Sequence, residues 1–231
     1  FLLLVENISV AVLMGANGAG TKIVPVSKFW LGHAQRRQCR IVFEPARTFA
    51  ACEYNQWRGF AVPPKAGTNS ARSLLRHIHR IICKRNKVKF KYLMRWLAWS
   101  VQNPHKHAEV VVVLQSATEG TGKSTLGNVM LKIFDRHGLL VEHHDRLLGK
   151  FNSQLETTCF ILGEELFWAG DRNIADALKS RITSDTIPIE AKYRNTRQVP
   201  SHLHVMLTTN HEWAVSAGAH ARRFFVVEVS D

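Results

Sequence analysis

Residues Ser116–Thr125 read SATEGTGKST and follow the apolar run Val110–Leu114. A buried strand that runs into a Gly-Thr-Gly-Lys-Ser loop and then into a helix is the sequence form of a phosphate-binding loop, or P-loop. The backbone N–H groups of such a loop and the N-terminus of the following helix face the ligand, where the helix dipole also favours negative charge. The stretch therefore predicts an α/β fold of the P-loop NTPase class.

The predicted nucleotide contacts are the loop residues Ala117, Thr118, Glu119, Gly120, Thr121, Gly122, Lys123, Ser124 and Thr125. We expect Lys123 to reach the terminal phosphates and Ser124 to offer its hydroxyl to Mg²⁺. Ala117 departs from the pattern G-x-x-x-x-G-K-[ST], in which a glycine begins the loop. Alanine fits there only if its φ is negative or the backbone is mildly strained. This departure is expected to affect the rate of nucleotide turnover more than the identification of the stretch as a P-loop.

A second glycine-rich stretch, GANGAGTK at residues 15–22, is a different feature. Its lysine comes one residue too late for a P-loop, its glycine order is not the dinucleotide fingerprint, and no helical pattern follows. We interpret it as a flexible turn between two strands.

The composition sets broad limits on the chain. Its 231 residues are 45% apolar, which is enough for a large core. No apolar stretch reaches transmembrane length and no signal sequence is evident, so we expect a cytoplasmic protein without a membrane partner. The first residue is Phe1 and the last is Asp231, directly after an apparent strand, which is typical of a fragment. The four cysteines lack metal-ligand spacing and are expected to be reduced thiols.

Charge is unevenly distributed along the chain. Residues 1–108 carry 18 Lys and Arg against 3 Asp and Glu, a net charge of +15, whereas residues 109–231 carry 13 against 15, a net of −2. A basic segment joined to a near-neutral nucleotide-binding segment favours a polyanionic partner such as nucleic acid. The alternative is a solvated surface that only confers solubility.

Three regions are predicted: a strand-rich basic region at 1–68, a helical basic segment at 69–108 and a P-loop ATPase domain at 109–231. The helical segment should contain amphipathic helices at 73–83 and 87–102. In the second helix, Trp96 and Trp99 stand at helical spacing among leucines, which is more typical of a core than of base stacking.

Polar residues follow two of the strands predicted downstream. The strand at 158–162 leads into Glu164 and Glu165, which are placed as in a Walker B site: one carboxylate for Mg²⁺, the other for orienting or deprotonating water. The strand at 203–208 leads to Asn210, whose amide suits the γ-phosphate or the lytic water. Without the P-loop, each would be a solvated strand end.

Two further groups are candidates for catalysis and DNA contact. Arg222 and Arg223 precede the last strand, where either is a candidate arginine finger for a neighbouring subunit or a partner in a structural ion pair. Lys192, Tyr193 and Arg194 lie in a predicted hairpin at 187–197, which suits a nucleic-acid backbone but also fits a solvated loop.

These motifs, in order, resemble the helicase portion of phage and plasmid primase-helicases, a superfamily-three, AAA+-like group. The matching runs are TEGTGKST, ILGEEL, ALKSRITSDTIPIEAKY, VMLTTNHEW and ARRFFVVEVS. The resemblance implies an ATP- and Mg²⁺-dependent ring, usually hexameric, that moves along single-stranded DNA during replication in a bacterial host. It assigns Lys123 and Ser124 to phosphate and magnesium, and Glu164 and Glu165 to Walker B. It also assigns Asn210 to the sensor, Arg222 or Arg223 to the finger, and Lys192 to the DNA loop.

Two other functions stay open at this point. An ATP-binding DNA scaffold or loader with weak hydrolysis is compatible with Ala117. A small-molecule kinase fits the P-loop but not the later carboxylate, amide and arginine series. Because these residues contain no primase active site, primer synthesis would require a preceding primase domain.

Overall fold

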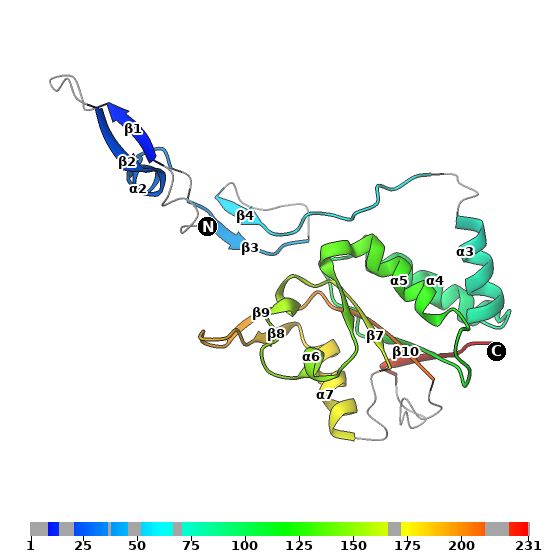
Figure 1. The fold of residues 1–231 in the computed structure, drawn as a ribbon. Helices are drawn as coiled ribbons and strands as arrows, with labels where there is room; N and C mark the ends of the chain where they lie inside the picture. The colour runs from blue at the N-terminus through cyan, green and yellow to red at the C-terminus, as the bar shows by residue number, and fades with distance from the viewer. Residues whose placement is uncertain are drawn as a thin grey trace. The chain divides into compact units, whose positions relative to one another are not determined.

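The computed structural model describes residues 9–13, 21–36, 38–45, 52–66, 71–165, 172–210 and 222–230. The chain divides into two compact units, the first formed by Phe1–Val42 with Ala50–Tyr54 and the second by Phe43–Phe49 with Asn55–Asp231. Figure 1 shows the elements of both units. The second unit contains the whole of the P-loop stretch.

The first unit contains short strands and one short helix. Strands β1 (Ser9–Leu13) and β2 (Thr21–Pro25) pair antiparallel, as predicted for strands that flank the second glycine-rich stretch. Residues 14–20 themselves lie outside the described part of the chain. Helix α2 (Val26–Gly32) was not predicted, because none of its residues is buried and its apolar side chains form no buried stripe. Strand β3 (Arg40–Val42) pairs with β4 (Glu53–Asn55), the second of which was also not predicted.

A five-stranded parallel sheet forms the centre of the second unit. Its strand order is β11–β5–β10–β7–β6. The bounds are β5 Val111–Gln115, β6 Gly138–Val141, β7 Phe160–Glu164, β10 His204–Thr209 and β11 Phe224–Glu228. The predicted α/β class is therefore confirmed, and its central sheet is parallel.

Side chains alternate between two cores, one on each face of this sheet. Val112 and Leu114 of β5 pack into the first core, while Val111 and Val113 pack into the second. All four are fully buried. A strand buried on both faces needs apolar residues at consecutive positions, which explains why the sequence shows an unbroken run instead of alternation.

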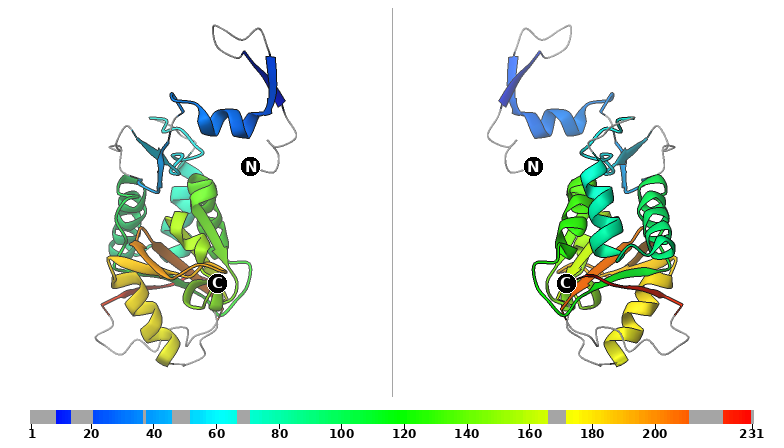
Figure 2. Two further views of the ribbon diagram at one scale, coloured as in Figure 1. Left: turned by 90° about the vertical axis from the view of Figure 1, so that its left-hand side faces the viewer. Right: turned by 90° about the vertical axis from the view of Figure 1, so that its right-hand side faces the viewer.

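Helices cover both faces of the sheet (Figures 1 and 2). The first face carries α3 (Arg72–His77), the π-helical segment η2 (Ile78–Ile82), α4 (Lys87–Gln102) and α5 (Lys123–Phe134). The second face carries α6 (Asp145–Leu148), α7 (Arg172–Thr183) and the hairpin of β8 (Thr186–Ile189) and β9 (Arg197–Pro200). Two 3₁₀ segments, η3 (Asp135–His137) and η4 (Ser153–Thr157), connect elements. Among the described residues, no helix is both long and apolar enough to cross a bilayer.

Helix α4 has the bounds predicted from the sequence, whereas the helix predicted at 73–83 changes its hydrogen-bonding pattern midway. The Asn86 side chain caps α4, since its Oδ1 accepts hydrogen bonds from the N–H groups of Val88 and Lys89 at 3.0 Å each. Trp96 is a core residue, 7% exposed, and its indole N–H donates to the Val110 carbonyl at 3.0 Å. Trp99 is 36% exposed, which the leucine spacing did not indicate.

The cysteines divide by location. Cys39 and Cys52 are exposed and belong to the first unit, while Cys83 and Cys159 are buried in the second. Burial raises the pKa of the Cys83 thiol to about 11 and raises that of Cys159 still further. A thiol with a raised pKa is a weak nucleophile at neutral pH, so both buried cysteines act as core residues.

Buried His204 should make stability depend on pH. Burial lowers its pKa to about 4, below the unfolded value of about 6.5. Its neutral form therefore stabilises the fold above pH 6.5, and this contribution is lost as the pH falls through 4, by roughly 3 kcal/mol. Urea unfolding at several pH values should show a shallower decline for His204→Phe. Parallel curves for the two proteins would contradict this assignment.

Candidate nucleotide-binding site

Most of the predicted loop residues and both glutamates line one cavity at the carboxyl ends of β5, β7 and β10, but Ala117 and Thr118 are not among its lining residues. The cavity has a volume of about 450 Å³ and is lined by residues 119–125, Glu164, Glu165, Thr208, Thr209 and Asn210. From β5 the chain crosses to β6 on one side, while β11 joins the sheet on the other side of β5. Ligands of parallel α/β sheets bind at such a switch point, outside the carboxyl ends of the strands.

The loop backbone explains its glycines and accommodates its alanine. Gly120 and Gly122 have φ angles of 75° and 80°, in the left-handed region that favours glycine. Ala117 is not among the residues with positive φ. Its backbone conformation is thus available to alanine without the left-handed penalty, so the departure from the glycine pattern adds no such strain.

Lys123, the first residue of α5, is 7% exposed and holds the loop together from inside. Its ammonium group donates to the Thr118 carbonyl at 3.2 Å, to the Ser116 hydroxyl and to Asn210 Oδ1 at 2.8 Å. These acceptors are all neutral. Lys123 also lines the cavity, where an anion can reach its ammonium group.

Asn210 connects the lysine to the acidic pair. Its Nδ2 donates to Glu165 Oε1 at 2.8 Å, while its Oδ1 accepts from Lys123. Glu165 has a φ of 48°, an uncommon conformation for a residue with a side chain, and its N–H donates to the Thr208 carbonyl at 2.9 Å. Such strain tends to occur at functional sites, where surrounding contacts maintain it.

Glu164 is suited to a metal ion. Its Oε1 is buried and has no hydrogen-bond partner in the described part of the chain. Ser124 lines the same cavity. Mg²⁺ usually takes one or two protein oxygens and completes its shell with water and substrate phosphates. The two side chains therefore fit a magnesium ion that is held jointly with a nucleotide. Across the described residues, no cluster of three or more His, Cys, Asp or Glu is arranged to hold a metal without such help.

His77 contributes to this site and was not singled out from the sequence. It ends α3, directly before the π-helical segment, and its Nε2 lies 3.2 Å from the Gly122 carbonyl. A Cβ atom on Gly122 would lie 2.5 Å from the His77 ring. Only glycine fits between this ring and the start of α5, and 45 residues of sequence separation gave no local signal for the contact.

Gly122→Ala and Gly120→Ala should differ in cost. Both positions have positive φ, so each alanine should lower the free energy of unfolding by about 1–2 kcal/mol. At position 122 the added Cβ would also contact the His77 ring, and this overpacking should cost about 1–3 kcal/mol more. At position 120 the added Cβ has no neighbour within 4 Å, so no such cost is expected. Urea unfolding measures both costs. The double variant His77→Ala/Gly122→Ala should recover the difference, and equal costs for the single variants would contradict the contact.

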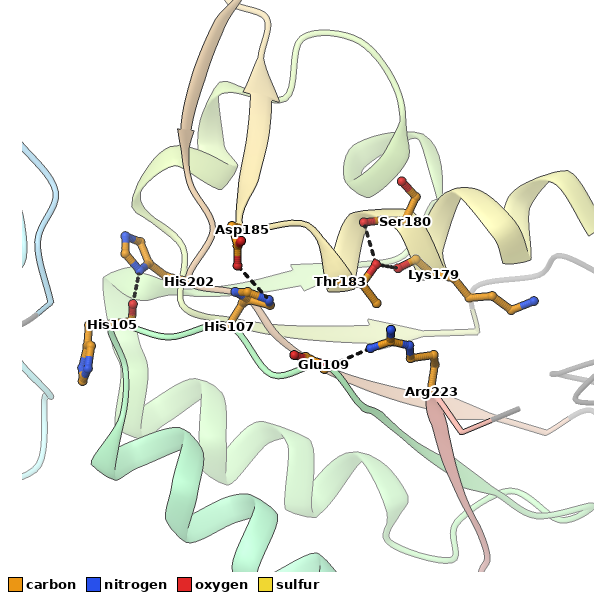
Figure 3. Close-up of polar contacts among 9 residues, drawn as sticks. All are labelled: His105, His107, Glu109, Lys179, Ser180, Thr183, Asp185, His202 and Arg223. Atoms are coloured by element: carbon orange, nitrogen blue, oxygen red, sulfur yellow. Dashed lines mark hydrogen bonds and ion pairs between the residues drawn. The ribbon is translucent and has the colours of Figure 1, made fainter. Parts of the chain in front are cut away.

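Arg222 and Arg223 are not brought to this cavity within the chain. Arg223 immediately precedes β11, and its carbonyl accepts from the N–H of Val111 at the start of β5. Its side chain donates to Glu109 Oε2 at 2.7 Å (Figure 3). Both arginines therefore lie at the amino end of the parallel sheet, opposite the P-loop, and Arg223 makes the ion pair considered as the structural alternative.

The predicted DNA-contacting residues lie at the turn of the β8–β9 hairpin. Tyr193 is 93% exposed, and the Lys192 ammonium lies 5.3 Å from the centre of its ring. The Asn152 side chain anchors the hairpin, donating to the Pro188 carbonyl and accepting from the Glu190 N–H at 2.9 Å each. The turn is thus held at its base, and its exposed basic and aromatic side chains are not among the residues that line the nucleotide cavity.

Comparison with known proteins gives one family model that matches part of the chain and several solved structures that are similar to it. The model of DUF5906, a family of unknown function, matches residues 114–223. A search of curated proteins found no match. The apo structure of the NrS-1 C-terminal region matches with a TM-score of 0.70 and 18% identity over 91% of this chain and 54% of that one. An A-form apo structure of the same region gives 0.69 and 19% over the same shares.

A compound-bound structure of JCV helicase is also similar, with a TM-score of 0.42 and 16% identity over 70% of this chain and 47% of that chain. This chain spans about half the length of the NrS-1 structures, 54% in each. At 18% and 19% identity, the similarity to NrS-1 shows a shared fold.

Proposed function

We propose that this chain is an ATP-dependent DNA helicase module of a phage or plasmid replication protein, which hydrolyses ATP to translocate on single-stranded DNA. The observation that carries the proposal is the single cavity in which Lys123, Asn210 and Glu165 form one hydrogen-bonded series. A cation for phosphate, an amide and a carboxylate are the groups that phosphoryl transfer to water requires.

Each side chain has a distinct role in this proposal. Lys123 and the loop N–H groups hold the triphosphate, and Ser124 with Glu164 holds the magnesium ion, which when bound neutralises phosphate charge. Glu165 orients or deprotonates the attacking water. Asn210 holds the Glu165 carboxylate on one side and Lys123 on the other, so it positions the water relative to the γ-phosphate without adding charge.

The position of the arginines supports an assembly of subunits. Arg222 and Arg223 lie at the end of the sheet opposite the P-loop, so neither is placed to act on a nucleotide bound to its own chain. In a ring, this end of one subunit can approach the cavity of its neighbour. A homo-oligomer, hexameric by the family resemblance, would let one of these arginines act as a finger.

ATP hydrolysis by the purified chain, measured with and without single-stranded DNA, tests the proposal. We expect hydrolysis that DNA stimulates, because a translocating motor couples the two. ATP binding without turnover, even with DNA present, would contradict a helicase and favour the ATP-binding scaffold or loader.

Lys192→Ala should weaken stimulation by DNA without changing basal ATP binding. The reason is that Lys192 lies at the exposed hairpin turn and lines no part of the nucleotide cavity. Loss of one phosphate contact should raise the DNA concentration for half-maximal stimulation several-fold at low salt. Lys150→Ala, another exposed lysine, is the matched control. Equal loss of basal and stimulated activity in the Lys192 variant would argue against a DNA-contacting hairpin.

A further inference from the structure

Helix α4 carries an exposed stripe of cations next to exposed aromatic rings. Lys87, Lys91 and Arg95 recur every four residues and are all exposed, so they lie along one side of the helix. Tyr92 and Trp99 are 41% and 36% exposed on the same helix. We call these five residues the α4 stripe.

The stripe belongs to a part of the chain that contains no acidic residue. Residues 54–108 include twelve Lys and Arg but no Asp or Glu. Within the described residues, none of the ion pairs uses a Lys or Arg of α3, η2 or α4. A solvated helix face usually mixes both signs of charge, so this one-signed surface favours a polyanion.

The stripe leads to a second cavity at the amino end of the sheet. This cavity has a volume of about 630 Å³, and its lining includes Tyr92, Trp96, Trp99 and Lys106. Two carboxylates also line it, but both have cationic or ionisable partners. Glu109 accepts from Arg223 at 2.7 Å, and Asp185 lies 4.0 Å from His107 (Figure 3).

The aromatic side chains of the cavity are held by packing. Tyr92 lies against Phe225, with ring centres 4.2 Å apart, and Trp99 lies against the buried His204 at 5.4 Å. A flat ring that is supported in this way and still partly exposed is suited to stacking on a nucleobase. Duplex bases are already stacked on each other, so a single strand is the form that can use it.

We propose that the α4 stripe and this cavity form a binding site for single-stranded nucleic acid, separate from the turn of the β8–β9 hairpin that carries Lys192, Tyr193 and Arg194. Lys87, Lys91 and Arg95 contact successive phosphates, and a base stacks on Trp99 in the cavity. This site extends the proposed function, but it needs no nucleotide. It can therefore be tested without ATP, and the failure of either proposal is distinguishable from the failure of the other.

The phosphate contacts are tested by the salt dependence of binding. Fluorescence anisotropy of a labelled oligothymidine of about 20 nucleotides, without ATP, gives the dissociation constant over a range of salt concentrations. The slope of log K against log salt is negative, and each lost phosphate contact makes it shallower by about 0.7 for a single strand, so Lys91→Gln/Arg95→Gln should make it shallower by about 1.4. Lys132→Gln/Lys150→Gln removes two exposed lysines elsewhere and should leave the slope unchanged. Equal slopes for all three proteins would overturn the proposal.

The base contact is tested at Trp99. Trp99→Ala should weaken oligothymidine binding about 10-fold, with partial recovery in Trp99→Phe, while an abasic oligonucleotide should bind both variants and the wild type alike. Phe151→Ala, at a ring that is 61% exposed outside the stripe, is the control. Thermal unfolding shows whether weaker binding by Trp99→Ala comes from a folding defect. If that variant is unfolded, binding by the milder Trp99→Phe variant tests the base contact instead. Loss that is equal for abasic and normal strands, or tighter binding of duplex than of single strand, would overturn the base site.

Discussion

Lys123→Ala is expected to reduce ATP hydrolysis by about 10²–10³-fold, the usual cost of removing one positioned group that stabilises developing charge. The lysine is buried in the loop, and the acceptors that Ser116, Thr118 and Asn210 offer it are neutral. Because these groups cannot replace a cation at the phosphates, the remaining loop should bind nucleotide weakly. Steady-state hydrolysis and ATP titration measure the two losses.

The fold should survive this change. Removing the side chain takes one donor from Thr118 and Asn210, which should alter the free energy of unfolding by about 1–3 kcal/mol. Lys132→Ala on the same helix removes an exposed lysine and should retain full hydrolysis. Unchanged hydrolysis in a folded Lys123→Ala variant would contradict the assignment of the cavity as the nucleotide-binding site.

Glu165→Gln should reduce hydrolysis by about 10²–10⁴-fold, as expected for loss of a group that accepts or orients a proton. Glutamine has the same shape and can still accept the 2.8 Å hydrogen bond from Asn210 through its carbonyl oxygen. Only the charge and the basicity are lost, so ATP binding should remain within a few-fold of the wild type. Single-turnover hydrolysis beside equilibrium ATP binding separates these effects.

The control for this variant is another carboxylate at the same end of the sheet. Glu228 ends β11, is exposed and does not line the nucleotide cavity. Glu228→Gln should therefore hydrolyse ATP normally. If Glu165→Gln lost binding and hydrolysis together, the carboxylate would have to support the site's architecture, and a different residue would have to act on water.

The sequence predicted the elements whose signals are local. The bounds of α4 followed from its 3.6-residue apolar spacing, and the strands of the sheet followed from unbroken apolar runs. The joint location of the P-loop, Glu164, Glu165 and Asn210 also followed, because parallel strands bring their carboxyl ends to one edge. Chain order and strand type were sufficient for these predictions.

Features that depend on contacts between distant residues were not predictable in this way. The ring of His77 against Gly122 joins residues 45 positions apart, and the Arg223–Glu109 ion pair spans 114 positions. The π-helical segment Ile78–Ile82 keeps the apolar pattern of an ordinary helix, so periodicity did not distinguish it. Helix α2 has no buried face, so the apolar pattern that reveals a packed helix does not identify it.

The distribution of the cysteines makes selective labelling possible. Cys39 and Cys52 are exposed in the first unit, whereas Cys83 and Cys159 are buried and have raised thiol pKa values. A maleimide dye at neutral pH should therefore attach to the first unit alone, without any engineered cysteine. The native chain thus offers a fluorescent reporter of how the first unit responds when nucleotide or a DNA strand binds the second.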